Sequence, residues 1–286
     1  MHYLILLLLA SAFAHAAVSP EKIENVRGLL RDRQLDAAES AANALVAAHP
    51  AEAEAYALLG SVQVAKGDGE AAVNACAKAV ELAPTSGDYQ LQLGNAYGLA
   101  AQKAGMFSKM SLGKKSIAAL EKAVELDPQN LAARQGLMSF YQMAPAMMGG
   151  GSDKAFAQAA EIKKLDTARG HVAYAILYVG EKKYAEAFAE TEEVLKSSPD
   201  HYAALFQFGR AAALSGSRID EGLAALNKCL ALTPAPGAPG HDAAHWRLGI
   251  IHEKRGDKTA ARAAYQASLK INPRFQQAID ALKKLD

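Results

Sequence analysis

The chain has 286 residues, which is long for a single hydrophobic core and ordinary for a stack of small units. Its 31 Lys and Arg balance 30 Asp and Glu, so the net charge of +1 provides no overall attraction to nucleic acid or to an anionic membrane. Hydrophobic residues make up 51 % of the chain, and Ala, the strongest helix former, supplies much of that share.

Residues 1–16 have the pattern of a secretory signal peptide. The apolar run from Tyr3 to Phe13 has the length of a signal-peptide core and is too short to span a bilayer. Ala14-His15-Ala16 follows as an A-x-A cleavage site, although no Lys or Arg precedes the apolar run. We therefore expect an exported protein, periplasmic or secreted. Its mature chain would begin at Ala17 and contain no membrane span.

From residue 19 the chain is predicted to form pairs of short amphipathic helices, each pair closed by a proline or by a residue in its place. The closers are Pro50, Pro84, Pro128, Thr167, Pro199, Pro234 and Pro273. They define seven units, at 19–50, 51–84, 85–128, 129–167, 168–199, 200–234 and 235–273. The last segment, 274–286, has apolar residues at helical spacing and is predicted to be a capping helix.

The third and fourth units are longer than the others, and we predict that the surplus forms enlarged turns between their helices, around 101–116 and 143–154. The six methionines beyond Met1 are Met106, Met110, Met138, Met143, Met147 and Met148. One interpretation is an adaptable apolar lip for a partner, made by Met106, Met110, Met147 and Met148. The alternatives are binding of a soft metal such as Cu(I), and packing of the two long turns on each other through their methionines.

The second, sixth and seventh units carry the most specific motifs. The sixth unit has Leu205-x2-Phe208-Gly209 and Pro234. The second unit has Tyr56-x2-Leu59-Gly60, Ala72-x3-Cys76 and Pro84. The seventh has His245-x2-Leu248-Gly249-x2-His252, Ala261-x3-Tyr265 and Pro273. This layout resembles that of the tetratricopeptide-repeat family, whose period is about 34 residues. Histidines stand at the two aromatic positions of the first helix in the seventh unit, which departs from the family pattern.

The resemblance implies an all-α fold, a right-handed superhelical solenoid of about seven helix pairs with a cap. It also implies a scaffold without enzymatic activity, which binds a protein or peptide in a concave groove lined by the first helix of each pair. The residues at the groove positions are Leu91, Asn95, Gln135, Ser139, Gln142, Phe206, Arg210, Trp246, Ile250 and Lys254. For Trp246, packing against the next helix is the alternative.

No motif in the sequence indicates catalysis, a cofactor or a metal site. The chain has no Gly-rich phosphate loop after a strand, no G-x-S-x-G and no C-x-x-C. His241, His245 and His252 lie near one another, but no carboxylate completes a convincing ligand set. Cys76 and Cys229 fall in units far apart in sequence, so we expect buried free thiols and no disulfide.

The sequence thus favours a scaffold or adaptor that binds a protein or peptide in the cell envelope through its groove and its enlarged turns. The alternative is a ligand-binding protein or copper carrier that uses the methionine-rich turns. The sequence does not predict an oligomeric state.

Overall fold

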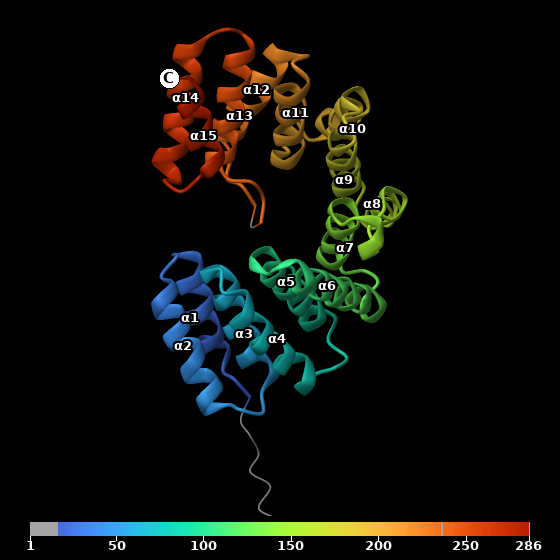
Figure 1. The fold of residues 1–286 in the computed structure, drawn as a ribbon, viewed down its shortest axis with the longest axis vertical. Coiled ribbons are helices and arrows are strands. Elements are labelled where there is room, and N and C mark those ends of the chain that lie inside the picture. The colour runs from blue at the N-terminus through green and yellow to red at the C-terminus, as the bar shows by residue number, and fades with distance from the viewer. Residues whose placement is uncertain (1–16, 236, 286) are drawn as a thin grey trace, which may run out of the picture. The chain divides into compact units, whose positions relative to one another are not determined.

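The computed structural model describes residues 17–235 and 237–285, and the predicted signal peptide at 1–16 lies outside them. Within these described residues the chain forms fifteen α-helices, one 3-10 helix and no strand, which confirms the all-α prediction (Figure 1). The helices divide between two compact parts. We call the described residues up to Gly136 the N-terminal lobe and those from Leu137 onward the C-terminal lobe.

The N-terminal lobe contains three complete helix pairs and the beginning of α7. Its helices are α1 (Pro20–Arg31), α2 (Leu35–Ala48), α3 (Ala53–Lys66), α4 (Gly69–Leu82), α5 (Gly87–Lys103), α6 (Met106–Leu126) and the first part of α7 (Leu131–Met143). From α1 to α6, each helix packs against the next one along the chain. In addition, α1 contacts α3 and α3 contacts α5, so the first helices of the pairs form a layer of their own.

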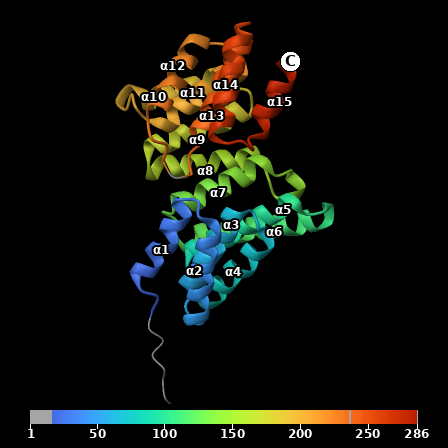
Figure 2. The ribbon, with the colours of Figure 1, turned by 90° about the vertical axis from the view of Figure 1, so that its left-hand side faces the viewer.

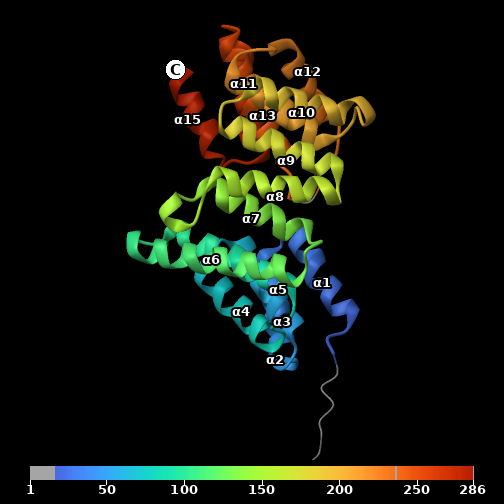
Figure 3. The same cartoon turned by 90° about the vertical axis from the view of Figure 1, so that its right-hand side faces the viewer.

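The C-terminal lobe contains the remainder of α7 with its partner α8, three further pairs and a last helix. Its elements are η1 (Ala146–Met148), α8 (Ser152–Leu165), α9 (Thr167–Gly180), α10 (Tyr184–Ser197), α11 (Tyr202–Ser215), α12 (Ile219–Leu230), α13 (His241–Lys254), α14 (Lys258–Ile271) and α15 (Gln276–Leu285). The first helices again touch, α9 against α11 and α11 against α13 (Figure 2). Figure 3 shows α8 and α9 side by side, as their contacts require.

Helix ends follow from proline and from aspartate caps. Helices α2, α4, α6, α10 and α14 each end two residues before the proline that closes their pair, because proline cannot donate the next helical hydrogen bond. At the other end, the carboxylates of Asp68, Asp166 and Asp257 accept hydrogen bonds from the backbone N–H three residues on, at 3.1, 2.9 and 2.9 Å. Thr167 stands where other pairs have proline. Because Asp166 caps the next helix, α9 begins at Thr167 itself, and no proline is needed to separate α8 from α9.

Left-handed residues make the tight turns between paired helices. Gly67, Gly216 and Gly256 have φ of 74°, 77° and 77°, which glycine adopts without steric strain. The turns of two other pairs use a non-glycine residue, Arg33 between α1 and α2 and Lys182 between α9 and α10, with φ of 56° and 61°. The turn between α11 and α12 contains Arg218, with φ of 54°, in addition to Gly216. One or two residues in this region reverse the chain within a few positions, so the two helices of a pair lie antiparallel and in contact.

The surplus of the third unit does not form the enlarged turn that we predicted over 101–116. Helix α5 continues to Lys103 and α6 begins at Met106, so the surplus lengthens both helices and only Ala104 and Gly105 separate them. The reason is local: this segment contains four Lys, two Ala and two Met, which favour a helix, and no proline to stop one. The fourth unit differs, because Pro145 interrupts the helix and 144–151 forms a real turn that includes η1.

Helix α15 covers the end of the C-terminal lobe. Ala278 of α15 is fully buried with Ala261 and Tyr265 of α14, and Leu282 packs against the same cluster. The exposed side of α15 is polar, as expected for a helix that covers the end of a repeat array. None of the helices within 17–235 and 237–285 combines the length and the apolar content that crossing a bilayer requires.

Candidate functional site

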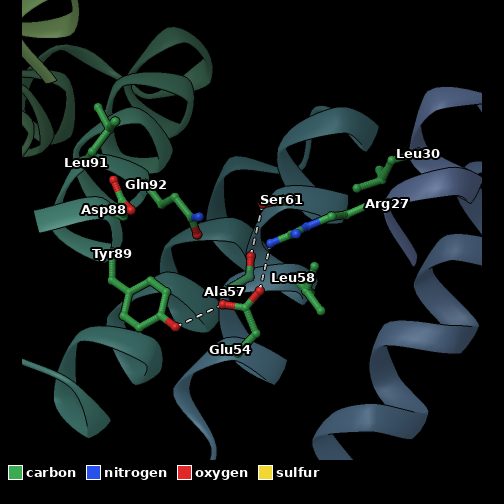
Figure 4. Close-up of a pocket in the computed structure, with 10 residues that line it drawn as sticks. All are labelled: Arg27, Leu30, Glu54, Ala57, Leu58, Ser61, Asp88, Tyr89, Leu91 and Gln92. Carbon is green, nitrogen blue, oxygen red and sulfur yellow. Dashed lines mark hydrogen bonds and ion pairs between the residues drawn. The ribbon is translucent and has the colours of Figure 1, made fainter. Parts of the chain in front are cut away.

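The first helices of the N-terminal lobe line a pocket of about 260 Å³ (Figure 4). Helices α1, α3 and α5 contribute its walls because they form one layer on the same face of the lobe. The lining residues are Arg27, Leu30, Glu54, Ala57, Leu58, Ser61, Asp88, Tyr89, Leu91 and Gln92. The pocket therefore combines an aliphatic wall with charged and amide groups from three successive repeats.

Glu54 joins the three helices at one side of the pocket. Its Oε1 accepts a hydrogen bond from Arg27 Nη2 at 3.0 Å, and its Oε2 accepts one from Tyr89 Oη at 3.0 Å. Figure 4 shows the Arg27 and Tyr89 side chains reaching Glu54 from opposite sides. Burial, together with the Glu54 carboxylate, raises the pKa of Tyr89 to about 12, so the phenol stays a neutral donor at physiological pH. The network fixes the side chains before any partner arrives.

Gln92 presents an unsatisfied acceptor at this pocket. Its Oε1 is buried and has no hydrogen-bond partner among the described residues. Asp88, four residues earlier on α5, is already engaged, because its Oδ1 accepts a hydrogen bond from Asn130 Nδ2 at 2.8 Å. A buried carbonyl oxygen without a donor is unfavourable by about 1–3 kcal/mol. A rotation of the Gln92 amide toward the pocket would let the N–H of a ligand remove that penalty.

The predicted groove residues of the N-terminal lobe lie on or beside this layer. Leu91 lines the pocket, and Asn95 is exposed one turn further along α5. Gln135 is exposed on α7. Arg27, Glu54 and Gln92 were not among the residues predicted from the sequence. The groove spacing could have found the first two, had it been extended to the first and second units.

The predicted groove residues of the C-terminal lobe have varied environments. Ser139 is exposed, whereas Gln142 donates through Nε2 to the Ile176 carbonyl at 3.3 Å. Ile250 is half-buried, and Lys254 is exposed at the end of α13. Phe206 is only 4 % exposed and packs in the hydrophobic core of the lobe, so it presents little surface to a partner.

Trp246 has the packing role that was the alternative for it. Its ring makes an edge contact with Phe275, with the ring centroids 5.6 Å apart, and it packs beside the cluster under α15. The same ring also forms a cation–π contact with Arg247, whose Cζ lies 4.0 Å from the ring centre. Arg210, on α11, is half-buried and donates from Nη1 to Gln207 Oε1 at 3.2 Å.

The methionines of the predicted lip differ in exposure. Met106 is 78 % exposed and Met147 is 73 % exposed, while Met110 and Met148 are half-buried. Met106 begins α6 beside Phe107, which is 87 % exposed and which the methionine pattern did not include. Met138 lies on α7, outside both predicted turns, and is 2 % exposed.

The two cysteines and His241 are engaged in the fold. Cys76 and Cys229 are buried free thiols, and burial raises the pKa of each to about 12. His241 is the first residue of α13 and its Nε2 contacts the Leu232 carbonyl at 2.8 Å. Within the described chain no three His, Cys, Asp or Glu side chains are grouped as a metal site would need.

Comparison with known proteins agrees with this architecture. The family model of the tetratricopeptide repeat matches residues 23–87 and 212–274. No curated protein sequence matches the chain. The chain is a tetratricopeptide-repeat protein, and its helix pairs form an α-solenoid of that family.

Solved structures show the same fold at low sequence identity. A tetratricopeptide repeat protein from Parabacteroides merdae has a TM-score of 0.66 and 16 % identity, covering 93 % of this chain and 97 % of its own. PilF from Pseudomonas aeruginosa has a TM-score of 0.51 and 15 % identity, covering 81 % and 97 %. The human IFIT1 dimer, solved with m7Gppp-AAAA, has a TM-score of 0.66 and 16 % identity, covering 94 % of this chain and 63 % of its own.

Proposed function

We propose that this protein is a non-enzymatic adaptor of the cell envelope, which binds a protein or peptide partner along the first-helix layer of its repeats. The tetratricopeptide fold supports a role as a protein-interaction scaffold in general. The observation that carries the proposal is the pocket of the N-terminal lobe, where Gln92 Oε1 is buried without a donor from the described residues, beside an aliphatic wall. A polypeptide can satisfy both features, because its backbone N–H groups can donate to the Gln92 oxygen and its apolar side chains can pack against the aliphatic wall.

The Arg27–Glu54–Tyr89 network supports a binding role, because fewer side chains have to become ordered when a partner binds. These three side chains come from three repeats and are held by hydrogen bonds of 3.0 Å. A partner therefore meets a fixed surface, and less side-chain entropy is lost on binding. Exposed Met106 and Phe107 at the start of α6 provide a second apolar contact surface in the same lobe.

The test uses two substitutions of the same type on one helix. Gln92→Leu removes the buried acceptor and replaces it with an apolar group of similar size, so the fold should tolerate it. Gln90→Leu, two residues away on another side of α5, is the matched control. A photoreactive residue at Leu91 should crosslink a partner from an envelope extract. Crosslinking should be lost in the Gln92→Leu background and retained in the Gln90→Leu background.

Two further results would contradict the proposal. One is equal capture when the photoreactive group stands at Ala47, which is exposed on the second helix of the first pair. The other concerns location: protein recovered from the envelope should begin at Ala17, and an uncleaved chain in the cytoplasm would refute the envelope assignment. Binding of Cu(I) that is lost when Met106 and Met147 are replaced would instead favour the metal-carrier alternative.

A further inference from the structure

The hairpin of α5 and α6 extends past the turn between α3 and α4. Helix α5 has 17 residues and α6 has 21, whereas α3 and α4 have 14 each. Gly69, the first residue of α4, lies against α5, since a Cβ atom added there would be 2.5 Å from Ala100 Cα. The chain that follows Ala100 therefore reaches beyond the end of α4 (Figure 3). We call residues 104–111, which include the turn of this hairpin, the hairpin tip.

Large apolar side chains of the hairpin tip are exposed. Met106 is 78 % exposed and Phe107 is 87 % exposed. Every residue from 105 to 109 is exposed, and successive side chains of a helix point about 100° apart, so the tip meets solvent on all sides. Met110, three residues after Phe107 on the same side of α6, is half-buried. Adjacent apolar side chains at a projecting point of the surface mark a contact site.

The segment around the hairpin tip carries positive charge only. Residues 89–120 contain no Asp or Glu and four lysines, which are Lys103, Lys109, Lys114 and Lys115. Asp68 and Glu70 of the neighbouring turn line a hollow beside the first of these lysines. Lys109 and Lys114, in contrast, are exposed and form no ion pair with a carboxylate in the described part of the chain. Lys114 lies on the same side of α6 as Phe107, two helical turns further on.

An apolar projection flanked by lysines is complementary to an anionic bilayer. Phe and Met side chains enter the boundary between headgroups and acyl chains, and lysines are attracted to the negative charge of the headgroups. A protein surface would need a pocket that encloses the tip, whereas lipids rearrange around a projection on all sides. We infer that the hairpin tip, together with Lys114, docks on an anionic lipid surface.

This inference goes beyond the proposed function, which concerns the pocket lined by α1, α3 and α5. It assigns the exposed surface at Met106 and Phe107 to lipid and leaves the pocket to the polypeptide partner. The two sites share no residue, so substitutions can test them separately. Phe107→Ser protein should still capture the partner through the photoreactive group at Leu91, and Gln92→Leu protein should still bind lipid.

The experiment measures sedimentation of the protein with lipid vesicles. One set of vesicles contains equal parts of phosphatidylglycerol and phosphatidylcholine, and the other contains phosphatidylcholine alone. Every protein sample begins at Ala17, so that the apolar run from Tyr3 to Phe13 cannot contribute. We expect saturable binding to the anionic vesicles, weakened by added salt, and little binding to the neutral ones. Equal binding to both sets, or no binding to the anionic set, would overturn the inference.

Substitution of the apolar contact has a matched control in the same lobe. Phe107→Ser should weaken binding to the anionic vesicles about tenfold or more, because the ring no longer leaves water. Val64→Ser, at an apolar side chain that is 39 % exposed on α3, should leave binding unchanged. Phe107→Ser should also unfold at an unchanged urea concentration. Unfolding at a lower concentration would show that the ring packs within the protein, which would refute a lipid contact.

The charge contribution is tested with two double variants that change the net charge equally. Lys109→Gln with Lys114→Gln should weaken binding roughly tenfold. Lys78→Gln with Lys122→Gln should have little effect, because Lys78 and Lys122 each pair with a glutamate three residues on, at 2.6 and 2.8 Å. Equal weakening by the two double variants would show that only the net charge matters, and would refute a site at the hairpin tip.

A fluorophore sensitive to polarity then distinguishes lipid from an acidic polypeptide. It is attached at Phe107→Cys, and the native thiols of Cys76 and Cys229 are buried. Anionic vesicles should shift its emission to shorter wavelength, and the same fluorophore at Ala47→Cys should show no shift. A shift with polyglutamate as large as the shift with anionic vesicles would assign the hairpin tip to an acidic polypeptide and overturn the inference.

Discussion

The ring of Tyr265 lies directly against the backbone of Gly249. A Cβ atom added at Gly249 would be 2.3 Å from Tyr265 Cε1, closer than any carbon–carbon contact allows. The Tyr265 hydroxyl also donates to Glu253 Oε1 at 2.9 Å, which holds the ring in place between α13 and α14. The Leu-Gly position of the repeat is therefore a site of close helix approach, and it explains why Gly stands in the middle of a helix.

Gly249→Ala should destabilise the protein by about 1–3 kcal/mol, because the added methyl group overpacks a fully buried contact. Urea unfolding measured by circular dichroism gives the change in free energy of unfolding. In a Tyr265→Leu background the same substitution should be less destabilising, since a smaller side chain leaves room for the methyl group. An equal penalty in both backgrounds would show that the ring is not the cause.

Gly28→Ala is the matched control for that experiment. Gly28 lies within α1, where an added Cβ would meet only Arg31 Nη2 at an ordinary 3.7 Å. Helix propensity then acts alone, and the substitution should stabilise the protein by roughly 0.5–1 kcal/mol. Opposite signs for the two Gly→Ala changes would separate packing from propensity, and loss of stability at Gly28 would contradict the open surroundings described for it.

Arg218 stabilises the turn between α11 and α12 through several contacts. Its guanidinium Cζ lies 4.9 Å from the centre of the Phe188 ring and 4.7 Å from that of Phe208, and it forms ion pairs with Glu192 and Glu221. Arg218→Lys keeps the charge but loses the planar stacking, so we expect a loss of about 1 kcal/mol in the free energy of unfolding. Thermal or urea unfolding measures that loss.

Arg33→Lys provides the control at an equivalent turn. Arg33 has nearly the same left-handed backbone, with φ of 56°, and is exposed without ion-pair or ring partners among the described residues. Its replacement should change stability by less than about 0.5 kcal/mol. Equal losses at the two positions would mean that the left-handed backbone disfavours Lys, and that the contacts of Arg218 contribute little.

The sequence predicts the helix pairs well because their ends depend on local chemistry. Proline closers and aspartate caps act within a few residues, and α14, which begins after Asp257 and ends before Pro273, illustrates both. The lengths of α5 and α6 were harder to predict, because surplus residues can lengthen either the turn or the two helices. There, the helix propensity of 101–116 was the deciding signal.

The candidate site was only partly predictable, for a geometric reason. Successive side chains of an α-helix point about 100° apart around the helix axis. A small rotation of the helix about that axis therefore decides which residues face the groove. That rotation depends on packing against both neighbours, which the sequence of one helix does not contain. Leu91 lies at the pocket as predicted by repeat position, but Phe206, at the equivalent position of α11, packs into the core. The unsatisfied oxygen of Gln92 could be recognised only with its surroundings in view.

Stability should fall at alkaline pH because the two thiols are buried. Burial raises the pKa of Cys76 and Cys229 from 9.0 to about 12 in the folded protein. Between these values the unfolded chain releases protons that the folded chain retains, so the free energy of unfolding decreases as pH rises above about 9. Each thiol contributes a slope of up to about 1.4 kcal/mol per pH unit, and below about pH 8 neither contributes a slope.

Urea unfolding between about pH 8 and 10 tests this dependence. A Cys76→Ala, Cys229→Ala double variant should show a much flatter decrease over that range, whatever its stability at neutral pH. Tyr89 and Tyr202, whose pKa values burial raises from 10.0 to about 12, add a slope of the same sign only near the upper end of this range, and the double variant retains that part. A slope that is unchanged in the double variant would assign the effect to other groups.

The two cysteines also report on the two lobes separately, because Cys76 lies in the N-terminal lobe and Cys229 in the C-terminal lobe. A buried thiol with a raised pKa reacts with an alkylating reagent only after its surroundings open. Gly249→Ala perturbs a contact in the pair that follows Cys229, and repeats pass such effects mainly to their neighbours. Pulsed alkylation followed by mass spectrometry should therefore find that this variant accelerates labelling of Cys229 severalfold and that of Cys76 much less. Equal acceleration at both thiols would show instead that the lobes unfold as one cooperative unit.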